Sequence, residues 1–110
     1  THGHGTFMAG IICRANDYLY FDLNLYMIRI GNPPLGPYEE AEAIRKAIQG
    51  PDGNVGTNDD ADILSMSFGG PPSSIRYEAI KFASSRNVIM IAAAGNRGDG
   101  NTSTNEIDYP

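Results

Sequence analysis

A histidine flanked by glycines is the first residue of this 110-residue sequence that could do chemistry. His4 lies in the run GHGTFMAG, which starts at Gly3. A neutral imidazole is suited to act as a general base because it exchanges a proton near neutral pH. The same run also fits a weak phosphate loop, but no strand precedes it and its third glycine is misplaced for a dinucleotide fingerprint. The run therefore favours acid–base chemistry over nucleotide binding.

Two further motifs each join an apolar run to a loop that is rich in small residues. The run ADILSMSFGG extends from Ala61 to Gly70, and the run VIMIAAAGN extends from Val88 to Asn96. Each has an apolar stretch followed at once by small or polar residues, as where a strand opens into a loop.

The elements that must position these motifs alternate between strand and helix. Apolar spacing and turn residues predict helices over residues 6–14 and 38–49 and from Ser73 or Ser74 onward. They predict strands over residues 23–30, 63–67 and 88–93, with loops over residues 31–37 and 50–60. Because strands that are apolar on both faces belong to sheets covered by crossover helices, we expect an α/β fold with a parallel sheet flanked by helices. The chemistry is then expected beyond the carboxyl ends of the strands.

In their order and spacing the three motifs resemble the subtilase family of serine proteases. The family has a histidine block GHGTxxAG, a substrate-binding strand D[IV]xxMS[LF]GG and an oxyanion block AAGN, and all three patterns occur in this sequence. The resemblance extends from Gly3 to Pro110, with the loop at residues 50–60 as an insertion. It implies a subtilisin-like three-layer sandwich. Residues 1–110 would form the central part of one peptidase catalytic domain, incomplete at both ends.

The resemblance also implies roles for individual residues. His4 would be the catalytic base that takes the proton from the serine hydroxyl and returns it to the leaving amine. Asn96 would donate to the developing oxyanion. Backbone groups would pair with an extended peptide as an added strand, and small side chains would leave room for its side chain in a first specificity pocket. The predicted substrate-binding residues are Leu35, Gly36, Ser67, Phe68, Gly69, Ala93 and Gly95.

Two members of the family's triad have no counterpart in the sequence. The family order is aspartate, histidine, serine, with the serine in a later GTSxA block, and no serine here has that context. We therefore expect a piece of a longer parent serine endopeptidase, inactive and poorly folded by itself because its sheet lacks neighbours. The alternative is a catalytically dead homologue that acts as a peptide-binding or interaction domain. An unrelated nucleotide-binding α/β domain is disfavoured by the absence of a proper phosphate loop.

Composition and charge argue against several classes of partner. Eight Lys and Arg stand against thirteen Asp and Glu, and no basic run occurs that could neutralise phosphates, so no nucleic acid is expected. The longest apolar stretch, residues 88–94, is too short for a membrane span.

Cys13 is the only cysteine and is predicted to be a small buried core residue. The expected partners are an extended peptide or protein substrate and, in the parent, a propeptide. An extracellular location is expected from family habit alone, because no signal peptide is seen.

No metal ligand set is predicted, and triad chemistry needs no cofactor, but a structural calcium ion is left open. The loop at residues 50–60 has an oxygen-rich spacing that loosely resembles a calcium loop, without the closing glutamate, and an ordinary solvated loop is the preferred interpretation. Phe7 stands where many family members have a second histidine. Residues 13–24 lack the glycine-rich loop that in many members helps to hold calcium.

Overall fold

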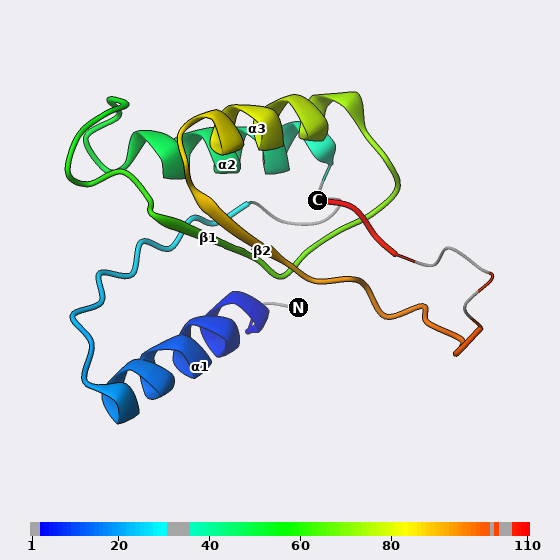
Figure 1. Cartoon of the computed structure of the whole chain (residues 1–110), viewed down its shortest axis with the longest axis horizontal. Helices are drawn as coiled ribbons and strands as arrows, with labels where there is room; N and C mark the ends of the chain where they lie inside the picture. The colour runs from blue at the N-terminus through cyan, green and yellow to red at the C-terminus, as the bar shows by residue number, and fades with distance from the viewer. Residues whose placement is uncertain (1–2, 31–35, 102, 104–106) are drawn as a thin grey trace.

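The structure is a computed structural model that describes residues 3–30, 36–101, 103 and 107–110. Its elements follow the order α1 (His4–Leu19), α2 (Pro37–Gln49), β1 (Ile63–Met66), α3 (Ser74–Ser85) and β2 (Ile89–Ala92). The two strands pair in parallel, with Ile63 opposite Ile89 and Met66 opposite Ala92. In Figure 1 this sheet lies between α2 and α3 on one side and α1 on the other. The expected α/β class, a parallel sheet flanked by helices, is confirmed.

Local signals in the sequence account for where α2 and α3 begin. Pro37 opens α2, where its missing N–H costs nothing, and the carboxylate of Glu39 accepts the N–H of Gly36 at 3.2 Å. At the start of α3 the hydroxyl oxygen of Ser73 accepts the N–H of Arg76 at 3.5 Å. Of the two serines proposed as the cap, Ser73 is therefore the one used.

The hydrophobic core lies between β1 and the layer formed by α2 and α3. Ala79 and Ala83 of α3 are fully buried, and their small side chains let α3 lie close against α2. Leu64 and Met66 of β1 point into this core, whereas Ile63 and Ser65 point away from it and are exposed. The alternation shows that the described residues cover only one face of the strand completely. The buried members of the core cluster are Ala41, Ile44, Ala47, Ile48, Leu64, Met66, Ala79 and Ala83.

A buried ion pair connects the two helices of this layer with the last described residues. Nε of Arg76 in α3 donates to Glu40 Oε2 in α2 at 2.5 Å, and both side chains are almost fully buried. Nη1 of Arg76 also donates to the carbonyl oxygens of Pro71, at 2.8 Å, and Tyr109, at 3.1 Å. One guanidinium therefore joins α2, α3, the loop after β1 and the segment at residues 107–110.

The prediction of a strand over residues 23–30 is wrong. The structure has no strand in that segment, and most of its side chains are exposed. A strand exists only where a neighbouring strand completes its ladder of hydrogen bonds, and no described strand pairs with these residues. The segment therefore has the residue types that are typical of a strand, but it lacks a neighbouring strand to pair with.

Helix α1 forms as predicted but differs from the prediction in its length and burial. It begins at His4 and ends at Leu19, beyond the residues 6–14 that were predicted, and none of its residues is fully buried. Cys13 is exposed, so its prediction as a core residue is wrong. Its most protected side chains, which are half-buried and lie on one stripe of the helix, are Met8, Ala9, Ile12 and Asn16. Part of this helix surface is thus left without a covering layer in the described structure.

Candidate active site

The loops that follow β1 and β2 leave the sheet side by side. Beyond the paired strand ends Met66 and Ala92, the N–H of Ala93 still donates to the carbonyl oxygen of Met66 at 3.1 Å. Because the strands are parallel, both loops emerge at the same edge of the sheet. The residues predicted to bind substrate in the second and third motifs are therefore brought together: Ser67, Phe68, Gly69, Ala93 and Gly95.

His4 reaches the end of β1 from the first turn of α1. Its Nε2–H donates to the carbonyl oxygen of Ser67 at 2.9 Å, across 63 positions of sequence. In the neutral tautomer that this bond requires, Nδ1 carries the lone pair and is left as an acceptor. The imidazole is exposed, so a competing partner can approach Nε2 without a large rearrangement. The structure thus places the first motif against the second.

The backbone after Ser67 is open for pairing. In the described structure no hydrogen bond engages the N–H or the C=O of Phe68 or of Gly69, and Gly69 is exposed. Unpaired backbone groups at a sheet edge are what an extended peptide can join as an additional strand. The side chain of Phe68 packs against the core cluster, which holds this open edge in place.

Residues 107–110 cross the ends of both strands. Tyr109 and Gly70 exchange two backbone hydrogen bonds of 2.9 Å each, which makes an antiparallel bridge. The N–H of Asp108 donates to the carbonyl oxygen of Ala94 at 3.1 Å. Asp108 is therefore held between the loop that follows β1 and the loop that follows β2.

The side chain of Asp108 lies directly against two glycines of the candidate site. A Cβ on Gly69 would lie 3.0 Å from the Cβ of Asp108, and a Cβ on Gly95 would collide with the Asp108 carboxylate. Gly95 also has a φ of +90°, which a residue with a side chain adopts only with strain. Both positions thus depend on glycine because Asp108 approaches so closely.

Asp108 is a residue of this site that the sequence motifs did not reveal. Its carboxylate forms an ion pair with the guanidinium of Arg97, which follows the third motif by one residue. The Arg97 side chain is 67% exposed, whereas that of Asp108 is 18% exposed. No local pattern distinguishes Asp108, because its proximity to Gly69 and Gly95 arises only from pairing between distant segments.

Asn96 directly follows the left-handed turn at Gly95. Its residue is exposed, and within the described part of the chain no hydrogen bond occupies its side-chain amide. An amide that points into solvent keeps both of its N–H donors available. Its predicted role toward an oxyanion stays a prediction, since no reacting group is present.

The model of the subtilase family matches residues 1–110. The chain belongs to the subtilase family.

Curated relatives agree with this assignment. The chain is 36% identical over 118 aligned positions to the major intracellular serine protease of Bacillus subtilis (strain 168) and 32% identical over 117 positions to an intracellular serine protease of Paenibacillus polymyxa. It is 30% identical over 119 positions to subtilisin Savinase of Lederbergia lenta. These alignments include 99% of this chain but 34%, 33% and 38% of the respective relatives, so this subtilase chain spans about one third of their length. No solved structure matches it significantly.

Two predicted substrate-binding residues of this subtilase chain lie before α2. Leu35 falls outside the described residues. Gly36 is the N-cap of α2, where its N–H donates to Glu39 and its carbonyl oxygen accepts the N–H of Glu40 at 3.2 Å. The described structure shows no hydrogen bond between Gly36 and the loops that follow the strands. A role for Leu35 and Gly36 in binding substrate therefore stays a prediction.

The acidic loop at residues 50–60 forms its own hydrogen-bond network. The carboxylate of Asp59 accepts the N–H of Asp52, at 2.9 Å, and the hydroxyl of Thr57, at 2.6 Å, while Asp60 accepts the N–H of Gly56 at 2.6 Å. The Thr57 hydroxyl and the Asp52 N–H lower the pKa of the Asp59 carboxyl below its ordinary value of 3.8. Among the described residues no group of three or more acidic, histidine or cysteine side chains could hold a metal ion. The carboxylates of Asp59 and Asp60 are thus engaged by donors of the loop itself.

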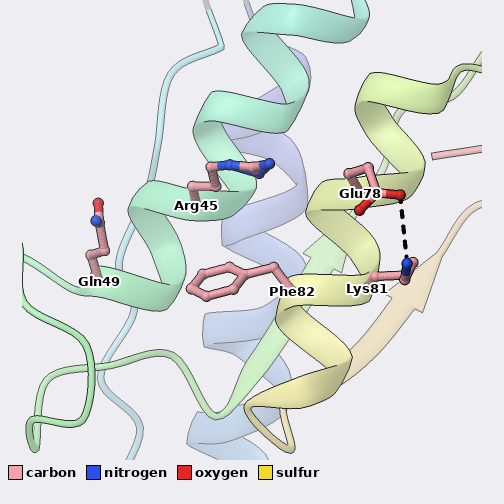
Figure 2. Close-up of a pocket in the computed structure, with 5 residues that line it drawn as sticks. All are labelled: Arg45, Gln49, Glu78, Lys81 and Phe82. Carbon is pink, nitrogen blue, oxygen red and sulfur yellow. Dashed lines mark ion pairs between the residues drawn. The ribbon is translucent and has the colours of Figure 1, made fainter.

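A shallow hollow lies on the outer surface of the helical layer, away from the three motifs. Figure 2 shows Arg45 and Gln49 of α2 on one side of it and Glu78, Lys81 and Phe82 of α3 on the other. Glu78 and Lys81 form an exposed ion pair at 3.6 Å. No residue of the candidate site lines this hollow.

No helix within the described ranges has the length and apolar character needed to cross a membrane.

Proposed function

We propose that this chain is the central part of the catalytic domain of a subtilisin-like serine endopeptidase, whose parent hydrolyses peptide bonds by acyl transfer. The observation that carries the proposal is the 2.9 Å contact between Nε2 of His4 and the carbonyl oxygen of Ser67. A general base can act on a bound peptide only if it lies beside the backbone that binds that peptide. The triad serine and aspartate would come from parts of the parent outside these residues.

The open backbone of Phe68 and Gly69 supports a mode of substrate binding. An extended peptide would pair with these groups as an added strand, which brings one of its carbonyl groups to the edge of the sheet where His4 lies. The bond from His4 to Ser67 is exposed, so its Nε2 can exchange this partner for a serine hydroxyl with little desolvation. In that arrangement the Nε2 lone pair would face the hydroxyl and the Nδ1–H would face the aspartate.

The chemistry then follows the course of the Ser-His-Asp triad. The serine oxygen bonds to the substrate carbonyl carbon as Nε2 of His4 takes its proton, and the same proton passes to the leaving amine when the C–N bond breaks. The negative charge that develops on the carbonyl oxygen needs a donor, and the unoccupied amide of Asn96 supplies one. Water completes the cycle by hydrolysing the acyl ester.

The residues present here would be inactive by themselves, because the nucleophile and the group that orients His4 are not among them.

An extracellular location is the remaining expectation from family habit. The names of the Bacillus and Paenibacillus relatives place those two proteins inside the cell. Fractionation of the source cells, followed by detection of the parent with an antibody, decides between the two compartments.

A fluorophosphonate probe applied to the full-length parent tests the proposed activity. The probe labels an activated serine, so we expect labelling of the wild-type protein and a large loss in His4→Ala. Removal of an oxyanion donor lowers kcat by roughly 10²- to 10³-fold, a magnitude measured in subtilisin itself, and Asn96→Ala should lose activity on this scale. Asn58→Ala, in the exposed acidic loop, is the matched control and should retain activity. A folded wild-type protein that takes no label at any pH would contradict the proposed activity and favour the catalytically dead homologue.

A further inference from the structure

The position of Asp108 beside the glycines of the candidate site bears on which substrates are accepted. Gly69 is predicted to leave space beside the first specificity pocket, and Gly95 is predicted to be part of the pocket wall. The structure shows that the side chain of Asp108 lies against both of them. A carboxylate therefore lies beside both glycines, where the resemblance predicts that a substrate side chain binds.

Four backbone or guanidinium contacts hold Asp108 in this position. Its own N–H donates to Ala94, and its neighbour Tyr109 exchanges two hydrogen bonds with Gly70. The carbonyl oxygen of Tyr109 accepts a further hydrogen bond from the buried guanidinium of Arg76 at 3.1 Å. Because the backbone is anchored on both sides, the carboxylate is preorganised for a charged partner.

The carboxylate already binds a guanidinium within the chain. Arg97 pairs with it, but the Arg97 side chain is 67% exposed and long, so its contribution is screened by water and it can move away. Asp108 is 18% exposed, and a charge in such a partly shielded position interacts more strongly with a cation that approaches it from a bound peptide. Arg97 thus occupies the position at the carboxylate that a cationic side chain of a bound peptide could take.

We propose that Asp108 makes the parent protease select substrates with lysine or arginine on the amino side of the scissile bond, and that the substrate cation displaces Arg97. This inference rests on the proposed function and adds a substrate class to it. In this proposal Asp108 and Arg97 have opposite effects on the binding of a basic substrate side chain. Asp108 attracts the basic side chain, and Arg97 competes with that side chain for the same carboxylate.

Peptide substrates that differ only at the residue before the scissile bond test this selectivity in the full-length parent. With Arg, Lys, Phe and Leu at that position, we expect wild-type kcat/KM to be highest for the basic pair. Asp108→Asn removes a charged hydrogen-bond acceptor without changing size, so kcat/KM for the basic substrates should fall about 10- to 100-fold. The values for Phe and Leu should change far less. Arg97→Gln should raise kcat/KM for the basic substrates, and Asp22→Asn, remote and exposed, is the matched control.

The opposite directions of the two variants separate substrate selection from a structural role. If the ion pair only stabilised the loop, Asp108→Asn and Arg97→Gln would lower activity together and on every substrate. Thermal melts of both variants check that they are folded. A common loss on all four peptides, or an unchanged preference in folded Asp108→Asn, would overturn the inference.

Binding of p-aminobenzamidine, a fluorescent amidine, tests the same carboxylate without turnover. We expect the wild-type protein and Arg97→Gln to bind this cation and Asp108→Asn to lose binding. If no peptide is cleaved but amidine binding depends on Asp108, the proposed activity fails while the cation-binding role stands. Equal amidine binding by the wild-type protein and Asp108→Asn overturns the role, whether or not peptides are cleaved.

Discussion

Replacement of Arg76 by methionine probes the buried charge that holds the helical layer and the candidate site together. The Arg76 and Glu40 side chains are 4% and 6% exposed, and their ion pair measures 2.5 Å. Methionine conserves most of the volume and helix propensity of arginine, so the change removes mainly the charge and its donors. The carboxylate of Glu40 is then left buried without a partner.

The magnitude follows from the contacts that are lost. Breaking a buried ion pair by removing one partner destabilises a protein by about 3–5 kcal/mol, because the remaining charge is uncompensated. The carbonyl oxygens of Pro71 and Tyr109 also lose the guanidinium as a donor, at about 1 kcal/mol each, although Tyr109 keeps the N–H of Gly70. In the double variant Glu40→Met with Arg76→Met no charge is left unpaired, so only the loss at the two carbonyls should persist, about 2 kcal/mol.

Urea unfolding of the full-length parent at pH 7 measures these free energies. Arg45→Met, on the exposed side of α2, is the matched control and should change stability by less than about 0.5 kcal/mol. We expect Arg76→Met to be less stable than the double variant. Glu40→Met alone completes the comparison. The reasoning is refuted if Arg76→Met costs no more than Arg45→Met, or if the double variant loses as much stability as Arg76→Met and Glu40→Met together.

Three further predictions follow from the glycine contacts, the acidic loop and the exposed apolar surface. Gly95→Ala should destabilise the protein by about 1–3 kcal/mol in urea unfolding, because φ is +90° there and the new Cβ meets Asp108, whereas Gly98→Ala meets nothing and should be neutral. Thr57→Val should raise the pKa of Asp59 in an NMR titration. Since the folded-state pKa of Asp59 is lowered, its stabilising effect is present above its ordinary value of 3.8 and is lost as pH falls through the lower folded value; an unchanged pKa in Thr57→Val would contradict this. The 110 residues alone should show no cooperative melt by circular dichroism and should bind ANS, because large apolar side chains of α1 and β2 are exposed, and a sharp two-state melt would disprove it.

Elements with strong local signals could be predicted from the sequence alone. The helix predicted at residues 38–49 begins one residue earlier, at Pro37, and ends at Gln49 as predicted. The strands predicted at residues 63–67 and 88–93 are confirmed as Ile63–Met66 and Ile89–Ala92. Periodicity, caps and glycine stops act over a few neighbouring residues, so they can be recognised without the fold. The family could be recognised for a similar reason, because each of its three motifs is a short contiguous run.

Tertiary structure decided whatever depends on a partner distant in the sequence. The apolar segment at residues 23–30 did not become a strand because no described neighbour pairs with it, and Cys13 is exposed because no described layer covers its side of α1. The contact of His4 with Ser67 and the position of Asp108 between Gly69 and Gly95 are likewise set by chain crossings. The sequence by itself thus determined which residues could do the chemistry, since that depends on their types and immediate neighbours. The fold determined which carboxylate stands beside them, because only folding brings segments that are tens of residues apart within hydrogen-bonding distance.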